Sequence, residues 1–180
     1  MQTGLDLLKI LSGGIIVSDF FENNPLDEKE EEDSLEEKYL TFMLGDEEFG
    51  VNIGFVTEII GIQAITFVPD LPVFVKGIIN LRGQIIPVID VRLRFQKPEV
   101  DYNERTCIIV LHIKDLPIGF IVDSVAEVDQ IPYENIIPPP SVRHSYHQQY
   151  ISGIGKVQEK IILIMDCDKL ISEDIGLASA

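Results

Sequence analysis

The sequence predicts an all-β protein with only short helices, folded as two five-stranded β-barrel subdomains that arose by internal duplication. Short apolar segments separated by turn residues at regular spacing predict barrels or sandwiches. A parallel α/β sheet would need longer helical segments between its strands. One part of the chain also recurs further along, as two copies of one structural unit require.

Residues 1–37 precede the predicted fold as an extension. The last part, 27–37, carries eight acidic residues and one lysine, so its charges repel one another and a flexible segment is expected. The apolar beginning predicts a short helix as far as about Leu11, which Gly13 and Gly14 would end. We treat the whole segment as an addition to the folded domain.

The first elements of the fold are predicted to be a hairpin and a short helical piece. Residues 39–44 and 48–53 alternate between apolar and polar and flank a Gly-Asp turn, which is typical of a β-hairpin. Residues 54–61 place four apolar side chains at helical spacing, which predicts a short helix or turn closed by Gly61. Residues 64–69 then resume a strand.

Two blocks of the first half of the chain recur in the second half. Residues 74–90 align without gaps with 150–166 at a shift of 76 positions, and a second block aligns at a shift of 69. The matched pairs are Gly77 and Gly153, Ile78 and Ile154, Ile85 and Ile161, Ile86 and Ile162, Asp90 and Asp166, Gly50 and Gly119, Val56 and Val125, and Glu58 and Glu127. Both halves keep the two blocks in the same order, which indicates a duplicated unit.

The duplication sets the predicted domain boundaries. Residues 39–95 and 106–172 are expected to be the first and second barrel repeats. Together they make one domain over 38–172, and residues 173–180 are left as a C-terminal tail.

The last strand of each repeat is nearly continuous in apolar residues. Such a strand needs cover on both faces, one from its own barrel core and the other from the sister barrel or a partner protein. Pro87 cannot donate a ladder hydrogen bond, which suits an edge strand or a bulge. Asp90 and Asp166 follow these strands and make sensible N-caps for short helices.

Two aspartates at equivalent positions also suggest the paired carboxylates of an aspartic protease, which share one proton. The residues after Asp90 and Asp166 are not the small hydroxyl residue and glycine of those enzymes, and a capping role explains both. A carboxylate-dependent hydrolase that uses the two aspartates is the enzymatic alternative. We find no other catalytic motif, so we expect a protein that is not an enzyme and has no cofactor.

The histidines and cysteines favour structural interpretations. His144 and His147 lie three residues apart without a cysteine or carboxylate cluster nearby, so an exposed loop is favoured over a metal site. His112 lies at the end of a strand and is expected to be either at the surface or satisfied by a hydrogen bond. Cys107 and Cys167 lie in apolar runs, which predicts buried thiols in a reducing compartment.

One arginine occupies the tip of a predicted hairpin. Arg82 precedes Gly83, whose freedom at positive φ allows the turn. The equivalent of Arg82 in the second repeat is Gln158, whereas Glu58 has an acidic equivalent in Glu127. The arginine is therefore a feature of the first repeat alone.

The composition limits the classes of function. The chain has 180 residues, 46% of them hydrophobic, which suffices for a buried core. A net charge of -16 argues against a nucleic-acid partner, because phosphates attract clustered Lys and Arg. No apolar stretch approaches the ~20 residues of a membrane helix, and the N-terminus lacks the basic region of a secretory signal. We therefore expect a cytoplasmic protein without direct membrane insertion.

Four segments resemble the CheW family of bacterial chemotaxis coupling proteins, over essentially all of residues 38–172. They are "LGDEEFGVNIGFVTEIIG", "FVKGIINLRGQIIPVIDVRLRF", "GFIVDSVAEV" and "YISGIGKV". The most specific feature is the ordered set Gly77, Asn80, Leu81, Arg82, Gly83, Pro87 and Asp90. The resemblance implies two five-stranded barrels and a non-enzymatic adaptor that couples methyl-accepting chemoreceptors to the CheA histidine kinase. Such an adaptor works at receptor arrays beneath the inner membrane.

The resemblance also implies site residues. In such proteins the groove between the barrels receives the helical tip of the receptor, which points to Val56, Glu58 and Val128, with Ile60 as a weaker addition. Arg82 is expected to interact with Glu58 and to orient its segment. Contact with the regulatory domain of CheA is expected from an apolar strand surface of the first barrel, for which the candidates are Ile65, Phe67, Ile85 and Val88.

Two questions stay open at this point. The regulatory domain of CheA and the CheV proteins share the module, so a detached regulatory module of a chemotaxis kinase is an alternative. The chain shows neither the kinase's catalytic and dimerisation segments nor a receiver domain, which favours a stand-alone adaptor. The extension 1–37 is longer than is usual in the family, and it could cover a groove, engage a partner or result from a different start site.

Overall fold

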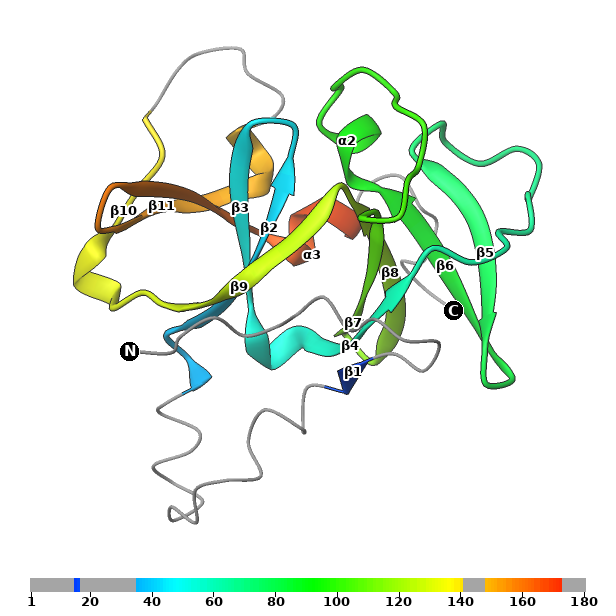
Figure 1. The fold of residues 1–180 in the computed structure, drawn as a ribbon, viewed down its shortest axis with the longest axis horizontal. Coiled ribbons are helices and arrows are strands. Elements are labelled where there is room, and N and C mark those ends of the chain that lie inside the picture. Colours follow the sequence, from blue (N-terminus) through cyan, green and yellow to red (C-terminus); the bar gives the residue numbers. More distant parts are fainter. Residues whose placement is uncertain (1–14, 17–34, 141–147, 173–180) are drawn as a thin grey trace.

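The computed structural model describes residues 15–16, 35–140 and 148–172, which form two six-stranded β-sheets with short helices (Figure 1). Across sheet A the order is β1 (Ile15–Ile16), β4 (Val56–Gly61), β7 (Cys107–Ile113), β8 (Leu116–Val122), β6 (Gln84–Asp90) and β5 (Val75–Leu81). Across sheet B it is β10 (Ile136–Ile137), β11 (Ile151–Val157), β12 (Lys160–Met165), β3 (Glu47–Asn52), β2 (Lys38–Leu44) and β9 (Ser124–Gln130). The α-helices α2 (Val91–Arg94) and α3 (Cys167–Ser172) follow β6 and β12. The predicted fold class is confirmed.

Each sheet has five long strands and one very short one. The long strands have six or seven residues, whereas β1 and β10 have two residues each and lie at sheet edges. The strand order of each sheet has two ends, so the sheets are open rather than the closed barrels that we expected. Five strands in each subdomain were nevertheless predicted correctly.

The two sheets share one topology. With the two short strands set aside, β4-β7-β8-β6-β5 matches β9-β2-β3-β12-β11 strand for strand. All neighbours are antiparallel except β6 with β8 and β12 with β3, which occupy equivalent places. The parallel pair Val88 with Gly119 in sheet A corresponds to Ile164 with Gly50 in sheet B. This is the duplication that the sequence predicted.

The repeats do not, however, form one sheet each. The hairpin β2–β3 belongs to the first repeat in sequence but lies in sheet B, and the hairpin β7–β8 of the second repeat lies in sheet A. The partition of residues 39–95 and 106–172 into separate barrels was therefore wrong. Alternation of apolar residues identifies a hairpin, but it does not say which of two similar sheet edges the hairpin joins.

Three clusters of buried side chains stabilise this arrangement. The largest takes residues from both sheets, among them Phe42 and Phe49 from sheet B and Ile109 and Phe120 from sheet A. Smaller clusters belong to sheet A alone and to sheet B alone. Full burial of a large apolar side chain contributes roughly 1.5–3 kcal/mol, so the shared cluster ties the two sheets into one folding unit.

The burial of β6 explains its continuous apolar sequence. Ile86 and Val88 join the cluster of sheet A, while Ile89 joins the cluster that both sheets share. Both faces of the strand are covered over these residues, as predicted. β6 lies between β8 and β5, so Pro87 is in an interior strand and not at an edge. The parallel ladder with β8 begins at Val88, directly after Pro87. The missing N–H of Pro87 therefore removes no hydrogen bond from that ladder.

Two local predictions were wrong and one was confirmed. The hairpin β2–β3 forms as expected, with Gly45 at a φ of +65° in its turn. Residues 56–61, expected to be a helix or turn, form strand β4 after a single 3₁₀ turn, Ile53–Phe55. Four β-branched residues in this strand favour extended backbone, and pairing with β7 satisfies it. Residues 64–69 form only one bridge, between Thr66 and Ile78.

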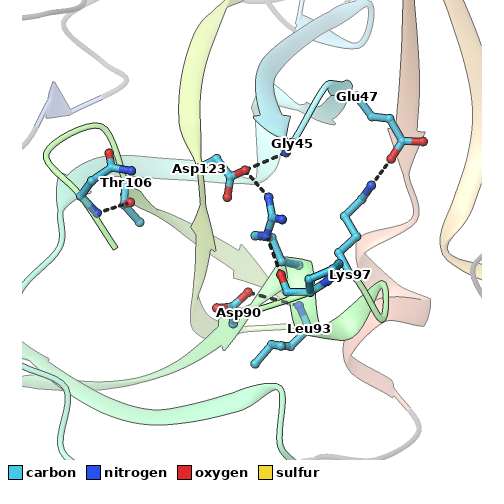
Figure 2. Close-up of polar contacts among 10 residues, drawn as sticks. Gly45, Glu47, Asp90, Leu93, Lys97, Thr106 and Asp123 are labelled. Atoms are coloured by element: carbon cyan, nitrogen blue, oxygen red, sulfur yellow. Dashed lines mark hydrogen bonds and ion pairs between the residues drawn. The ribbon is translucent and has the colours of Figure 1, made fainter. Parts of the chain in front are cut away.

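The ends of the last strands cap the helices as predicted. Asp90 Oδ1 accepts a hydrogen bond from Leu93 N at 3.2 Å, and Asp166 Oδ1 accepts one from Lys169 N at 3.0 Å. Figure 2 shows the first of these caps beside a polar network that joins the two sheets. In that network, Asp123 accepts hydrogen bonds from Gly45 N in the β2–β3 turn, at 2.7 Å, and from the Arg92 guanidinium of α2, at 2.5 Å.

Parts of the extension contact the fold. Residues 35–37 lie against sheet B, where Glu36 O accepts from Asn52 Nδ2 at 2.8 Å and Glu37 O accepts from Ile131 N at 2.7 Å. The acidic run therefore ends in an attached segment rather than in a flexible linker. The predicted helix ending near Leu11 and the tail 173–180 lie outside the described residues.

Candidate functional site

The site begins with an ion pair between β4 and the tip of the β5–β6 hairpin. Arg82 Nη1 donates to Glu58 Oε1 at 2.8 Å, and Arg82 Nη2 donates to Glu58 Oε2 at 2.9 Å. The Glu58 side chain is 7% exposed and the Arg82 side chain 56% exposed. These hydrogen bonds raise the pKa of Arg82. Two parallel bonds fix a carboxylate in orientation as well as in position, so Arg82 holds the Glu58 carboxylate in one orientation.

The hairpin tip is shaped for this contact. Arg82 has a φ of +51° and Gly83 a φ of +87°, a pair of positive values typical of a tight type I′ turn. Asn80 Oδ1 accepts a hydrogen bond from Gly83 N at 2.8 Å and closes the turn. The expected contact between Arg82 and Glu58 is therefore present, and the turn places the Arg82 side chain within hydrogen-bonding distance of Glu58.

The second repeat has an analogous pair with a different cation. Gln158, the equivalent of Arg82, has the same backbone conformation, with a φ of +53°. Two residues later, Lys160 donates to Glu127, the equivalent of Glu58, and its Nζ also lies 3.5 Å from Asp129 Oδ2 and 3.9 Å from Glu48 Oε1. The hydrogen bond to Glu127 raises the pKa of Lys160. Sequence alignment missed this pair because the cation has moved by two positions.

The other residues implied for receptor contact are mostly buried. Val56 belongs to the cluster shared by both sheets, and Ile60 to the cluster of sheet A, each with 7% exposure. Val128 on β9 is half-buried and packs against the shared cluster from sheet B. Val56 and Val128 thus approach the same cluster from opposite sheets. Two surface hollows, of about 370 Å³ and 400 Å³, are lined by other residues, so a groove lined by Val56, Glu58, Ile60 and Val128 stays a prediction.

The four candidates for kinase contact divide by exposure. Phe67 is 76% exposed and Ile85 is 54% exposed, so both are available to a partner. Ile65 is half-buried against the cluster of sheet A. Val88 is fully buried there, and its assignment to a partner surface was wrong, because alternation along β6 points it into the core.

Sequence reasoning missed two exposed apolar residues in the same region. Val73 is 78% exposed and Leu71 is 37% exposed, both in the loop between β4 and β5 that also carries Phe67. Their signal was weak, because single apolar residues next to prolines are common in loops. Ile161, the equivalent of Ile85 in sheet B, is also 54% exposed.

The two candidate catalytic carboxylates, Asp90 and Asp166, have structural roles. Asp90 accepts from Leu93 N and also from the Tyr102 hydroxyl at 2.8 Å, while Asp166 caps α3, so each carboxylate serves its own helix. Burial and the bond to Asp90 raise the pKa of Tyr102. These contacts give no support to a shared proton between the two aspartates.

The thiols and histidines agree with their structural interpretations where they are described. Cys107 and Cys167 are buried free cysteines, and burial raises the pKa of Cys167 to about 12. His112 is exposed, while His144 and His147 lie outside the described residues. No group of three or more metal-ligating side chains occurs in the part of the chain that the structure describes. Among the same residues, no helix has the length and apolar character to cross a membrane.

Comparison with known proteins agrees with this geometry. The family model of the CheW-like domain matches residues 38–174. The chain belongs to the CheW-like domain family. The chemotaxis protein CheW of Klebsiella aerogenes is 37% identical over 138 residues, which cover 77% of this chain and 83% of that protein. The chemotaxis protein CheW of Thermotoga maritima is 32% identical over 142 residues, which cover 78% of this chain and 92% of that protein.

A solved CheW structure has the same fold. The scaffolding protein TtCheW from Thermoanaerobacter tengcongensis superposes with a TM-score of 0.71 at 37% sequence identity, covering 76% of this chain and 93% of that chain. The resemblance to the CheW family drawn from the sequence is therefore confirmed. The family match begins at residue 38, so β1 lies outside the residues that the family model matches.

Proposed function

We propose that this chain is a non-enzymatic chemotaxis adaptor that couples methyl-accepting chemoreceptors to the CheA histidine kinase. One observation carries the proposal: the bidentate pair between Glu58 and Arg82, which joins strand β4 to the β5–β6 hairpin within a CheW-like fold. The adaptor would work at receptor arrays on the cytoplasmic face of the inner membrane.

The receptor is proposed to contact the region around Glu58. A receptor tip is a helical hairpin, and a helix binds a groove through its apolar face while polar groups at the rim set its register. Val56 and Val128 supply apolar side chains from the two sheets, and Glu58 supplies an oriented carboxylate. Arg82 would act by holding that carboxylate, while its 56% exposure also allows a contact of its own.

The kinase is proposed to bind the exposed apolar residues beside β5. Phe67 and Val73 are the most exposed large apolar residues of the described chain, and Ile85 on β6 is exposed as well. Large apolar side chains that are this exposed are available to a partner protein, and a contiguous patch of them would mark a binding surface. The CheA regulatory domain is the partner that the family relationship suggests.

The test of the proposal replaces Arg82 with the residue that the second repeat has. Arg82→Gln keeps a polar side chain at the hairpin tip but removes the charge and the two parallel bonds to Glu58. We expect receptor-dependent activation of CheA, measured as kinase phosphorylation in reconstituted arrays, to fall at least tenfold. Circular dichroism at the assay temperature should show an unchanged fold.

Lys76→Gln is the matched control. Lys76 also belongs to sheet A and pairs with Glu99 at 2.6 Å, so the substitution removes a charge and an ion pair that does not involve Glu58. It should leave kinase activation within twofold of the native value. Equal activation by the native protein and Arg82→Gln, with both folded, would contradict the proposed role of the pair.

A further inference from the structure

The extension contributes a strand to sheet A. Residues Ile15 and Ile16 form β1, which lies beside β4 (Figure 1). The two strands pair antiparallel, with Ile15 opposite Ile59 and Ile16 opposite Glu58. β4 has β7 as its neighbour on the other side. A segment far from β4 in sequence therefore covers the edge of the strand that carries Glu58.

This strand has no counterpart in sheet B. The equivalent of β4 is β9, which ends sheet B in the part of the chain that the structure describes. The other short strand, β10, pairs with β11 and corresponds to the bridge between Thr66 and Ile78 on β5. The five-stranded unit is thus complete without β1, and β1 is an addition to an edge that already exists.

An edge strand presents a row of unpaired N–H and C=O groups that can bind an extended segment of another chain or of the same chain. The edge of β4 is such a surface, and the occupant in this structure is the segment Ile15–Ile16. Its sequence context, "GGIIVS", supplies β-branched residues that favour an extended backbone.

We propose that the edge of β4 is a binding site for an extended strand, that Ile15–Ile16 occupies it intramolecularly, and that this occupancy competes with the receptor tip for the Glu58 region. The competition rests on the proposed function, because it requires the receptor to bind at Glu58. The strand pairing itself does not depend on that function.

The size of β1 fits a displaceable occupant. Two paired residues form a weak element, and such short segments open readily while the core remains folded. β1 and the domain belong to the same chain, which keeps the occupant at an effective concentration on the order of millimolar. If the edge is open in about a tenth of the molecules, the apparent receptor affinity is about tenfold weaker than that of the open form.

The first experiment measures the pairing in the full-length chain. The double variant Ile15→Pro/Ile16→Pro removes both N–H groups of β1 and is incompatible with strand pairing. Amide hydrogen exchange at the amides of β4, Val56–Gly61, that face β1 should become about tenfold faster than in the native chain, while exchange in β9, Ser124–Gln130, should not change. The matched control Ile15→Val/Ile16→Val keeps both N–H groups and should exchange like the native chain.

Two results would overturn the pairing. Equal exchange in β4 for the native chain and the proline variant would mean that β1 does not protect this edge. Protection that rises with protein concentration would mean that a second copy of the chain supplies the strand.

The second experiment measures binding of a soluble chemoreceptor fragment that contains the cytoplasmic helical tip. We expect the proline variant to bind about tenfold more tightly than the native chain, and the valine control to bind like the native chain. Equal affinity of all three overturns the competition but leaves the adaptor function intact. Absence of binding by every variant overturns the proposed receptor contact and with it the competition, whereas the exchange result still decides the strand pairing.

Discussion

Arg82 differs from its equivalent Gln158 in the contact that its side chain makes with Glu58, and not in its backbone conformation. Arg82 and Gln158 have nearly the same positive φ, so the two hairpins turn alike and differ in the side chain at the tip. The first repeat uses that side chain to bind Glu58 through two hydrogen bonds. The sequence alone predicted the contact through family resemblance, but it could not show that Glu58 is buried while Arg82 is exposed.

Glycine at position 77 is required by close backbone approach, and this gives a prediction at the residue scale. Gly77 has a φ of +140°, and a Cβ there would lie 2.1 Å from Thr66 O. Gly77→Ala adds a steric clash to backbone strain, so we expect the free energy of unfolding to fall by about 3 kcal/mol or more. Chemical denaturation measures the loss.

Gly83→Ala is the control for that prediction. Its φ is +87°, but a Cβ there meets nothing within 4 Å, so strain is the one cost and a loss of about 1 kcal/mol is expected. A similar loss for the two variants would show that the approach of Thr66 to Gly77 does not matter for stability.

At the scale of elements, the sequence predicted strands and caps better than it predicted strand partners. The hairpin β2–β3 and the two aspartate caps have local signals, namely alternation, a turn and a cap residue before a helix. β4 was predicted as a helix or turn because Phe55, Val56, Ile59 and Ile60 match helical spacing. Val56, Ile59 and Ile60 are β-branched and pair with β7, which favours the strand that is observed. The partner of a strand is set by contacts distant in sequence, and β1 is the extreme case.

The ion pair of sheet B gives a prediction for β12. Lys160 faces Glu127, Asp129 and Glu48, and the last two side chains are 14% and 15% exposed. Lys160→Met leaves three carboxylates together without this cation. The lysine is 39% exposed, so solvent screens its attraction to these carboxylates. We therefore expect the free energy of unfolding to fall by about 1 kcal/mol.

Salt and pH check the electrostatic origin of that loss. High salt should narrow the difference between native protein and variant, because it screens exposed charges. The pKa of Lys160 is raised by folding, so its stabilising contribution is present below its ordinary pKa of 10.5 and is lost as the pH rises through the folded value. Lys114→Met is the control, since Lys114 and its partner Asp168 are 61% and 54% exposed and should contribute nothing measurable.

At the scale of the whole molecule, the exchanged hairpins make the two sheets interdependent. Arg94 of α2 lies between two aromatic rings at equivalent positions in the repeats, with its guanidinium 4.3 Å from the Phe74 ring and 4.5 Å from the Tyr150 ring. Its Nε donates to Leu170 O of α3 at 3.1 Å. A buried cation that contacts both repeats, together with the network around Asp123 (Figure 2), joins the sheets across their shared core.

This interdependence predicts that neither half of the chain folds alone. A chain cut between Val100 and Asp101, two exposed residues, separates the two repeats. The first fragment would lack β7 and β8, which lie between β4 and β6 in sheet A, and the second would lack β2 and β3, which lie between β9 and β12 in sheet B. Each fragment would therefore have a sheet interrupted at its centre and half of the shared core exposed to water.

We expect the fragments 1–100 and 101–180 to be unfolded separately by circular dichroism and amide exchange, and to recover the native spectrum when mixed in equal amounts. The recovered complex should unfold in one transition, because the shared cluster is formed only when both fragments are present. Its midpoint should rise with concentration, as mass action requires for a folded state assembled from two chains. Independent folding of either fragment would contradict this prediction, because it would mean that a repeat can complete a sheet with its own hairpin. The placement of β2–β3 in sheet B and of β7–β8 in sheet A would then not be what holds the two sheets together.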